Sequence, residues 1–197
     1  MVQEPEFLQD KPKVDHPEAK EIPFGTISLM LAIVVVVAVL GVQLFRQNQV
    51  QPVPGERAPQ FEVVSYDGDT YTLNDLRGQI VIVNMWASWC GPCHEEADDL
   101  QQIHEDYASE GVLMLGVNWL DIDSEALDFI DYYGITYPNA PDMGERVYNA
   151  FNVQGMPETF VIGRDGIVRA TFLGGTNYEA LASAIDEILL AETEEAS

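Results

Sequence analysis

Residues 79–93 read QIVIVNMWASWCGPC, and this stretch decides the fold. Its first part, residues 79–86, is an apolar run of strand length, which is typical of a central strand buried on both faces. The run leads directly into Cys90-Gly91-Pro92-Cys93, and a helical pattern follows. A strand, a tight turn and a helix in this order predict that both cysteines lie where a helix begins beside a sheet.

Segments on both sides of this stretch also have strand and helix patterns. Upstream, Asp67-Gly68-Asp69 separates two short strand-like segments and predicts a β-hairpin over residues 61–73. The downstream pattern predicts strands over residues 112–119, 159–162 and 167–172, a short helix over residues 146–151, and a terminal helix marked by Leu181, Ile185 and Ile188. Helices between parallel strands, closed by a hairpin of the last two strands, predict an α/β sandwich.

One more helix is expected between the strands at 112–119 and 159–162. Ser124 is a candidate N-cap, and Gly134 is a candidate end of this helix. The spacing of Leu127, Ile130 and Tyr133 predicts that these side chains face the core.

The charge of the chain excludes one large class of function. Nine Lys and Arg residues stand against 33 Asp and Glu residues, which gives a formal net charge of −24 at pH 7. Nucleic-acid binding needs clustered Lys and Arg to neutralise phosphates, so we exclude a nucleic-acid partner. The acidic surface favours basic partners through steering, or serves solubility.

The chain divides into five segments by composition. Residues 1–23 are polar and contain four prolines, which predicts a disordered tail, and residues 24–45 carry no charge. At 1.5 Å per residue the uncharged segment would span roughly 33 Å, which predicts an uncleaved transmembrane helix. The lysines that precede it favour a cytoplasmic tail. Residues 46–57 are expected to form a linker, residues 58–190 the globular domain, and residues 191–197 a frayed tail.

Cys90 and Cys93 are the two cysteines of the chain. A single pair can neither complete a structural four-ligand zinc site nor build a disulfide framework, which leaves a redox pair or an incidental small-loop disulfide. A helix N-terminus favours the thiolate form of Cys90, and Pro92 suits the first helical turn. Cys93 is expected to face inward with poor exposure. We therefore predict that Cys90 attacks a substrate disulfide and Cys93 resolves the mixed disulfide.

Residues 86–93, WASWCGPC, resemble the active site of thioredoxin-like proteins. The pattern over residues 67–78 and the stretch GMPETFVI at residues 155–162 resemble the membrane-anchored TlpA/DsbE-like branch, and the similarity covers about residues 55–190. The resemblance implies a thioredoxin-like α/β fold with an N-terminal β-hairpin extension, preceded by a single transmembrane helix. It also implies that Pro157 is cis, lies opposite the cysteines and keeps metals off the thiols.

The resemblance also points to acidic residues near the cysteines. Cytoplasmic thioredoxins carry a buried Asp six residues before the nucleophile, where this chain has Asn84, so the general base is expected elsewhere. Glu96 shares the inward face of the cysteine helix, and Glu158 follows Pro157. Both match acids of the cytochrome c maturation members. Glu96 could instead belong to the solvated acidic run at residues 95–99.

These observations predict a thiol–disulfide oxidoreductase whose redox centre is the cysteine pair, with no metal and no other cofactor. The neighbouring His94 is expected to be a solvated residue of the first helical turn. The catalytic candidates are Cys90, Cys93, Glu96 and Glu158, and the substrate-binding candidates are Trp89, Gly91, Pro92, Met156 and Pro157.

The resemblance further implies where the enzyme works and on what. We expect a monomeric, single-pass protein of the cell membrane whose catalytic domain lies outside the cytoplasm. Its clients would be protein thiols and disulfides, with apocytochrome c or its maturation factors as the candidates, and a membrane protein would supply electrons. A peroxiredoxin-like peroxidase is an alternative, although Ala87 stands where that site needs Thr. A redox-inert chaperone or copper carrier is another, for which Met156 is thin support.

Overall fold

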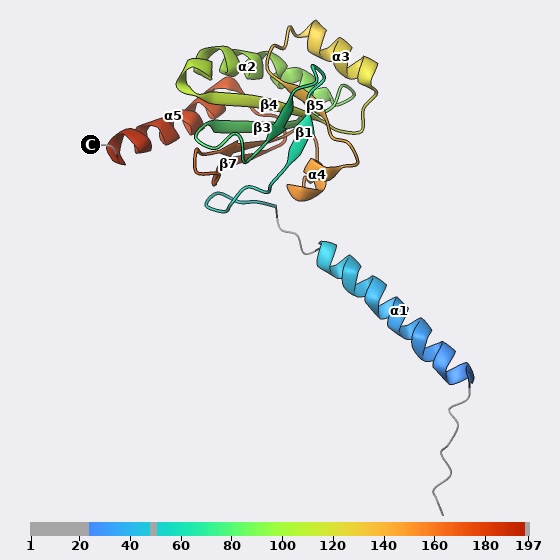
Figure 1. The fold of residues 1–197 in the computed structure, drawn as a ribbon. Helices are drawn as coiled ribbons and strands as arrows, with labels where there is room; N and C mark the ends of the chain where they lie inside the picture. Colours follow the sequence, from blue (N-terminus) through green and yellow to red (C-terminus); the bar gives the residue numbers. More distant parts are fainter. Residues whose placement is uncertain (1–23, 48–50, 196–197) are drawn as a thin grey trace, which may run out of the picture. The chain divides into compact units, whose positions relative to one another are not determined.

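The structure, a computed structural model, describes residues 24–47 and 51–195 (Figure 1). The chain forms two compact units, Met1–Gln49 and Val50–Ser197. The first contains helix α1, Phe24–Gln47. Within the described residues, no helix is long and apolar enough to cross a membrane, so the transmembrane span predicted over residues 24–45 is not confirmed. The tail predicted over residues 1–23 lies outside the described residues.

The second unit contains two sheets and their helices. Strands β1 and β2 form an antiparallel hairpin, as predicted. A five-stranded sheet has the order β5-β4-β3-β6-β7. The elements, in chain order, are β1 (Glu62–Val64), β2 (Thr70–Thr72), β3 (Ile80–Trp86), α2 (Gly91–Tyr107), η2 (Ala108–Glu110), β4 (Val112–Asn118), α3 (Asp123–Tyr132), β5 (Asn139–Pro141), α4 (Arg146–Ala150), β6 (Glu158–Ile162), β7 (Val168–Leu173) and α5 (Tyr178–Glu195).

The central strand is β3, as the apolar run predicts, and all of its residues are buried. It pairs in parallel with β4 and antiparallel with β6, while β5 and β7 form the edges. Alternate side chains of β3 enter two separate cores. Ile80 and Ile82 pack beneath α2, α3 and α5, whereas Val81, Val83 and Met85 pack beneath the hairpin and α4.

Helix α3 differs from its prediction in register. It begins at Asp123, with Ile122 at the N-cap position, rather than with Ser124 as the cap. Its buried residues are Ala126 and Phe129, because the Phe129 ring packs on Trp86 with 4.6 Å between the ring centroids. Of the three residues predicted to face inward, Ile130 and Tyr133 are half-buried and pack against the core, whereas Leu127 is exposed.

Strand β5 was absent from the sequence prediction. It contains only three residues, and it forms because it pairs in parallel with residues 116–118 of β4. The end of the chain also differs from its prediction. Residues 191–195 continue α5 instead of fraying, since Ala and Glu are good helix formers and Glu192 forms a salt bridge of 2.9 Å with Arg164.

The predicted linker at residues 46–57 is in part attached to the domain. Residues 46 and 47 belong to α1 instead of the linker, and residues 51–57 follow the edge of β7. Gly55 donates its N–H to the Val168 carbonyl at 2.9 Å, and Val168 returns a hydrogen bond of 2.8 Å to Glu56. The edge strand therefore gains backbone partners, which covers donors and acceptors that would otherwise be open to other chains.

Candidate active site

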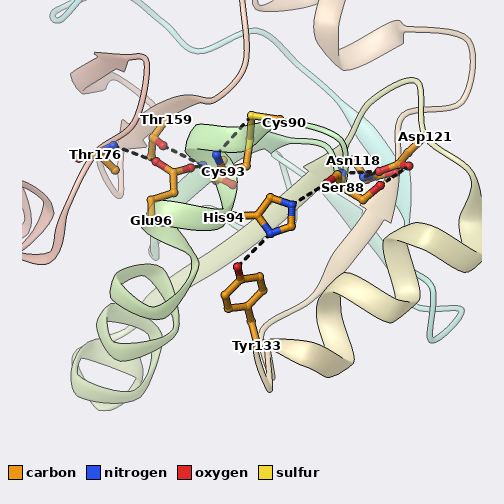
Figure 2. The surroundings of a disulfide bond; sticks show 11 residues. Ser88, Cys90, Cys93, His94, Glu96, Asn118, Asp121, Tyr133, Thr159 and Thr176 are labelled. Carbon is orange, nitrogen blue, oxygen red and sulfur yellow. Dashed lines mark hydrogen bonds between the residues drawn. A yellow bond between two sulfur atoms is a disulfide. The ribbon is translucent and has the colours of Figure 1, made fainter.

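Cys90 and Cys93 lie at the start of α2, directly after the carboxyl end of β3, and form a disulfide (Figure 2). Cys90 is the N-cap residue, and its sulfur accepts the Cys93 N–H at 3.3 Å. The predicted placement of Cys90 at the helix start is therefore confirmed. The expected difference in exposure is not seen in this disulfide form, because Cys90 is 4% exposed and Cys93 is 2% exposed. What distinguishes the two sulfurs is their position relative to the helix end.

The residues around the cysteines follow from the same local geometry. Pro92 occupies the first turn of α2, where no helical hydrogen bond needs its missing N–H. Gly91 and Pro92 are exposed between the two cysteines. Trp89 is also exposed, and its indole N–H donates to the Leu120 carbonyl at 3.0 Å. Trp89, Gly91 and Pro92, which were predicted to bind substrate, are thus exposed on the surface next to the disulfide.

Glu96 is a buried acid one turn after Cys93 on α2. It is 1% exposed, which excludes the alternative that it is one of a run of solvated acids. Asn84 donates to one carboxylate oxygen at 2.8 Å, and the Thr176 N–H donates to the other at 2.8 Å. Burial raises the pKa of Glu96 to about 7, although these two hydrogen bonds favour the charged form. The carboxyl group can therefore gain or lose a proton near neutral pH.

The network around Glu96 connects four parts of the domain. Asn84, from the central strand, also donates to the Thr159 hydroxyl at 3.0 Å. Thr176 belongs to the loop between β7 and α5, so Glu96 joins α2 to β3, β6 and that loop (Figure 2). A single polar residue inside an apolar strand marks Asn84 in the sequence. Thr176 acts through its backbone, and the sequence contains no signal for it.

The Met156–Pro157 peptide bond is cis, as the resemblance implies. Pro157 is buried, and its carbonyl accepts the Gly174 N–H at 3.0 Å. Since β6 runs antiparallel to β3, its first residues lie beside the last residues of β3, from which the cysteine loop starts. Met156 is half-buried and packs against both cores. This loop therefore lies at the same end of the sheet as the disulfide.

Glu158 is buried at this end of the sheet but points to a different face from Glu96. Along β6, Phe160 and Ile162 pack under the hairpin and α4, and alternation places Glu158 on that same face. One carboxylate oxygen accepts the N–H groups of Gln154 at 2.9 Å and Gly155 at 3.0 Å, and the other accepts the Gln51 amide. Burial raises the pKa of Glu158.

Glu158 therefore supports the loop before Pro157 rather than joining the Glu96 network. Its two backbone hydrogen bonds hold residues 154–155, which lead directly into the cis bond. Gln51, in the described end of the predicted linker, completes the set of three donors. The sequence analysis placed Glu158 directly after Pro157, but the face to which its side chain points depends on where β6 begins.

A second carboxylate, Asp121, secures the other side of the cysteine loop, and the sequence analysis did not identify it. Asp121 accepts hydrogen bonds from the Ser88 N–H at 2.6 Å and the Ser88 hydroxyl at 2.7 Å. It also accepts from Asn118 at 2.8 Å and from the Ile122 N–H at 2.9 Å. Partial burial acts to raise the pKa of Asp121, but these hydrogen bonds outweigh it and hold the pKa below its usual value.

His94 adds a further connection on the same side. Its Nε2 lies 2.8 Å from the Ser88 carbonyl, and its Nδ1 lies 2.9 Å from the Tyr133 hydroxyl. The imidazole thus bridges the cysteine loop to the end of α3, in contrast to the merely solvated residue that was predicted (Figure 2). Among residues 24–47 and 51–195, no group of three or more His, Cys, Asp and Glu side chains could hold a metal ion.

A cysteine pair at the start of a helix, beside a sheet and a cis-proline loop, defines a thioredoxin-like redox protein. A family model described as the AhpC/TSA family matches residues 54–171. The thiol–disulfide oxidoreductase ResA of Bacillus thuringiensis (strain Al Hakam) is 30% identical over 134 residues, which is 68% of this chain and 78% of that protein. The thiol:disulfide interchange protein DsbE of Allochromatium vinosum is 31% identical over 171 residues, 85% of this chain and 91% of that protein.

A solved structure supports the same assignment. The thiol:disulfide interchange protein of the thioredoxin family from Chlorobium tepidum TLS is 28% identical and superposes with a TM-score of 0.63. The match covers 72% of this chain and 99% of that one. The chain therefore belongs to the AhpC/TSA family. Within this family it is a thiol–disulfide oxidoreductase of the ResA and DsbE type, with a thioredoxin-like α/β fold.

Proposed function

We propose that this enzyme reduces disulfides of client proteins outside the cytoplasm, and that the uncharged segment at residues 24–45 attaches it to a membrane. The observation that carries the reductase proposal is the buried Glu96, whose pKa of about 7 and position one turn after Cys93 suit a proton acceptor for that thiol. The uncharged segment at residues 24–45 supports the anchor.

The proposed reaction starts from the reduced enzyme. The Cys90 thiolate attacks one sulfur of the client disulfide, which forms a mixed disulfide and releases the client's other sulfur as a thiolate. The Glu96 carboxylate then takes the proton of the Cys93 thiol. The Cys93 thiolate attacks the Cys90 sulfur, which breaks the mixed disulfide and releases the second client thiolate. The client gains two electrons, and the enzyme is left with its own disulfide.

The residues that surround the thiols support the proposed direction of electron flow. The acids Glu95, Glu96 and Glu158 oppose a stable Cys90 thiolate, and Gly91-Pro92 between the cysteines adds no positive charge. A destabilised thiolate favours the disulfide form, which makes the couple reducing. We expect a potential nearer to that of thioredoxin, about −270 mV, than to that of a strong oxidant at about −120 mV.

The clients and the electron donor are proposed from the relatives and from the location. The names of the ResA and DsbE relatives give thiols and disulfides as the chemistry. The resemblance of residues 155–162 to cytochrome c maturation proteins supports apocytochrome c or its maturation factors as clients. A reductant outside the cytoplasm needs continual re-reduction, so a membrane protein that carries electrons is the proposed donor. The enzyme acts as a monomer in this proposal.

Two measurements test the proposal. Equilibrating the chain with glutathione gives its potential, and a value near that of the strong oxidants would contradict the reductase role. A Cys93→Ser variant in the native host should accumulate mixed disulfides through Cys90, and these should identify the clients. Export of a reporter fused after Ser197, with retention in membranes after alkaline washing, is the expected result for the anchor. A soluble mature form would overturn it.

A further inference from the structure

A groove lies beside the cysteine loop, on the side that faces α3. We call it the α3 groove and define it by the apolar residues Trp89, Leu120, Ile122 and Tyr132 and the acidic residues Glu125 and Asp128. It starts at Trp89, the residue before Cys90, and it runs along α3 from Ile122 to Tyr132. It is separate from the Glu96 network and the Pro157 loop, since none of those residues lines it in the described part of the chain.

The apolar residues of the α3 groove are unusually open to water. Trp89, Leu120, Ile122 and Tyr132 are each more than half exposed. Single exposed apolar residues are ordinary, but a group of large ones in one depression marks an interaction surface. Solubility does not explain them, because a protein with a net charge of −24 could place acids at these positions.

Hydrogen bonds within the chain hold the walls of the groove in place. Asp121 fixes the Ser88 backbone and the start of α3, and the Trp89 indole is tied to the Leu120 carbonyl. Leu120 itself has a φ of 44°, a left-handed conformation that is unfavourable for leucine. Such conformations persist where the surroundings impose them, often at binding sites. The surface is therefore preformed, which lowers the entropy lost on binding.

The charge of the groove indicates what it can bind. Glu125 and Asp128 are exposed on successive turns of α3 and border the apolar floor. Among the described residues that line the groove, none is Lys or Arg. An acidic segment or an anionic lipid surface would be repelled here, whereas Lys or Arg beside an apolar side chain would satisfy both features.

We propose that the α3 groove binds the client polypeptide beside its cysteine, and that the bound segment carries an apolar side chain flanked by Lys or Arg. The inference rests on the proposed function, since it assigns the client of the same redox site. Seating the apolar side chain against Ile122 and Tyr132 would bring the adjoining client sulfur toward Cys90, because Trp89 joins the groove to the disulfide. The groove would thus select clients by sequence, while the cysteines perform the chemistry.

Binding is tested first, because it does not depend on turnover. The probes are two short cysteine-free peptides, one with a leucine flanked by arginines and one with glutamates in place of the arginines. Titration calorimetry with the full chain should detect the cationic peptide and not the acidic one. Ile122→Ser should weaken binding by about tenfold, while Leu190→Ser, an equally exposed position on α5, should not. Equal binding of both peptides, or equal loss in both variants, would overturn the proposal.

The charges are tested by the double variant Glu125→Gln/Asp128→Asn. It should weaken binding of the cationic peptide about fivefold at low salt, and the difference should shrink as salt is added. Glu179→Gln/Glu187→Gln, which also removes two exposed charges but on α5, is the matched control. A salt-independent loss would contradict the electrostatic part. Concentration-dependent self-association that Ile122→Ser abolishes would identify a second copy of the chain as the occupant and would overturn the client assignment.

Turnover separates this proposal from the proposed function. Disulfide-containing versions of the two peptides are compared with hydroxyethyl disulfide, which has no polypeptide to fill the groove. The ratio of kcat/KM for the cationic peptide to that for hydroxyethyl disulfide should fall about tenfold in Ile122→Ser. If the wild-type chain reduces neither substrate, the reductase role fails whatever the peptides bind. If it reduces both and the ratio is unchanged, only the groove proposal fails.

Discussion

Replacing Glu96 with Gln removes a buried carboxyl group whose pKa lies near neutrality. Burial raises the pKa of Glu96 from its ordinary value of 4.5 to about 7. The folded protein therefore holds this proton more tightly than the unfolded chain does. The resulting stabilisation is complete below about pH 4.5 and is lost as the pH rises through 7. At about 1.4 kcal/mol for each pH unit between the two pKa values, the effect amounts to about 3 kcal/mol.

The measurement is urea unfolding of the oxidised wild-type chain and of Glu96→Gln between about pH 4 and pH 8. Gln also loses one of the two hydrogen bonds, because both partners, Asn84 and the Thr176 N–H, are donors. That loss is independent of pH, so the informative quantity is how the difference in unfolding free energy between the two proteins changes with pH. The stability advantage of the wild type over the variant should shrink by about 3 kcal/mol across this range. Glu95→Gln, at the exposed neighbouring position, should show no such change.

The same variant tests the proton transfer. Without an acceptor for the Cys93 proton, release of the client should slow by about tenfold or more at neutral pH, and the dependence of the rate on a group near pH 7 should disappear. Single-turnover kinetics of mixed-disulfide resolution measures this step. A stability difference that does not vary with pH, together with an unchanged pH–rate profile, would refute the assignment of Glu96 as a buried proton acceptor.

Three further predictions concern other parts of the domain. Gly116→Ala should lower the free energy of unfolding by about 2 kcal/mol in urea titrations, because a Cβ atom there would lie 1.9 Å from the Asn139 side-chain oxygen. Asp121→Asn should cost about 2 kcal/mol above pH 4, and the difference should fade as the pH drops below the ordinary aspartate range, since the folded pKa of Asp121 is lowered. In the reduced chain, iodoacetamide should label Cys90 before Cys93 at neutral pH, as mass spectrometry can report; labelling in the reverse order would exchange their roles.

Those parts of the fold that depend on local sequence were predictable. The apolar run identified β3, and the cysteine motif placed the start of α2, because strand burial and helix capping act over a few residues. Strand β5 was not predictable, since its three residues form a strand only through pairing with β4. The register of α3 was misjudged for a similar reason: Phe129 packs on Trp86, which is distant in sequence.

The residues of the site also divide into those that the local sequence predicts and those that it does not. Glu96 could be placed on the inward face of α2 because helical spacing relates it to Cys93. The partners that bind its carboxylate come from β3 and from the loop before α5, and the second of them donates a backbone N–H that any residue type could supply. Asp121 belongs to a polar cluster at the carboxyl end of β4, and that position is a signal that could have identified it.

Asp121 and Glu96 lie in different environments, and this difference gives them different roles. Asp121 holds the cysteine loop in place, and Glu96 is the proposed proton acceptor. Hydrogen bonds hold Asp121 in its charged form, so its hydrogen bonds with Ser88 persist well below neutral pH. Glu96 is buried with fewer donors, so its charge changes near pH 7. Across the pH range in which Glu96 gains or loses its proton, the loop that carries Cys90 therefore keeps one geometry. A resolving thiol needs this arrangement, because its proton must move while the distance between the two sulfurs stays short.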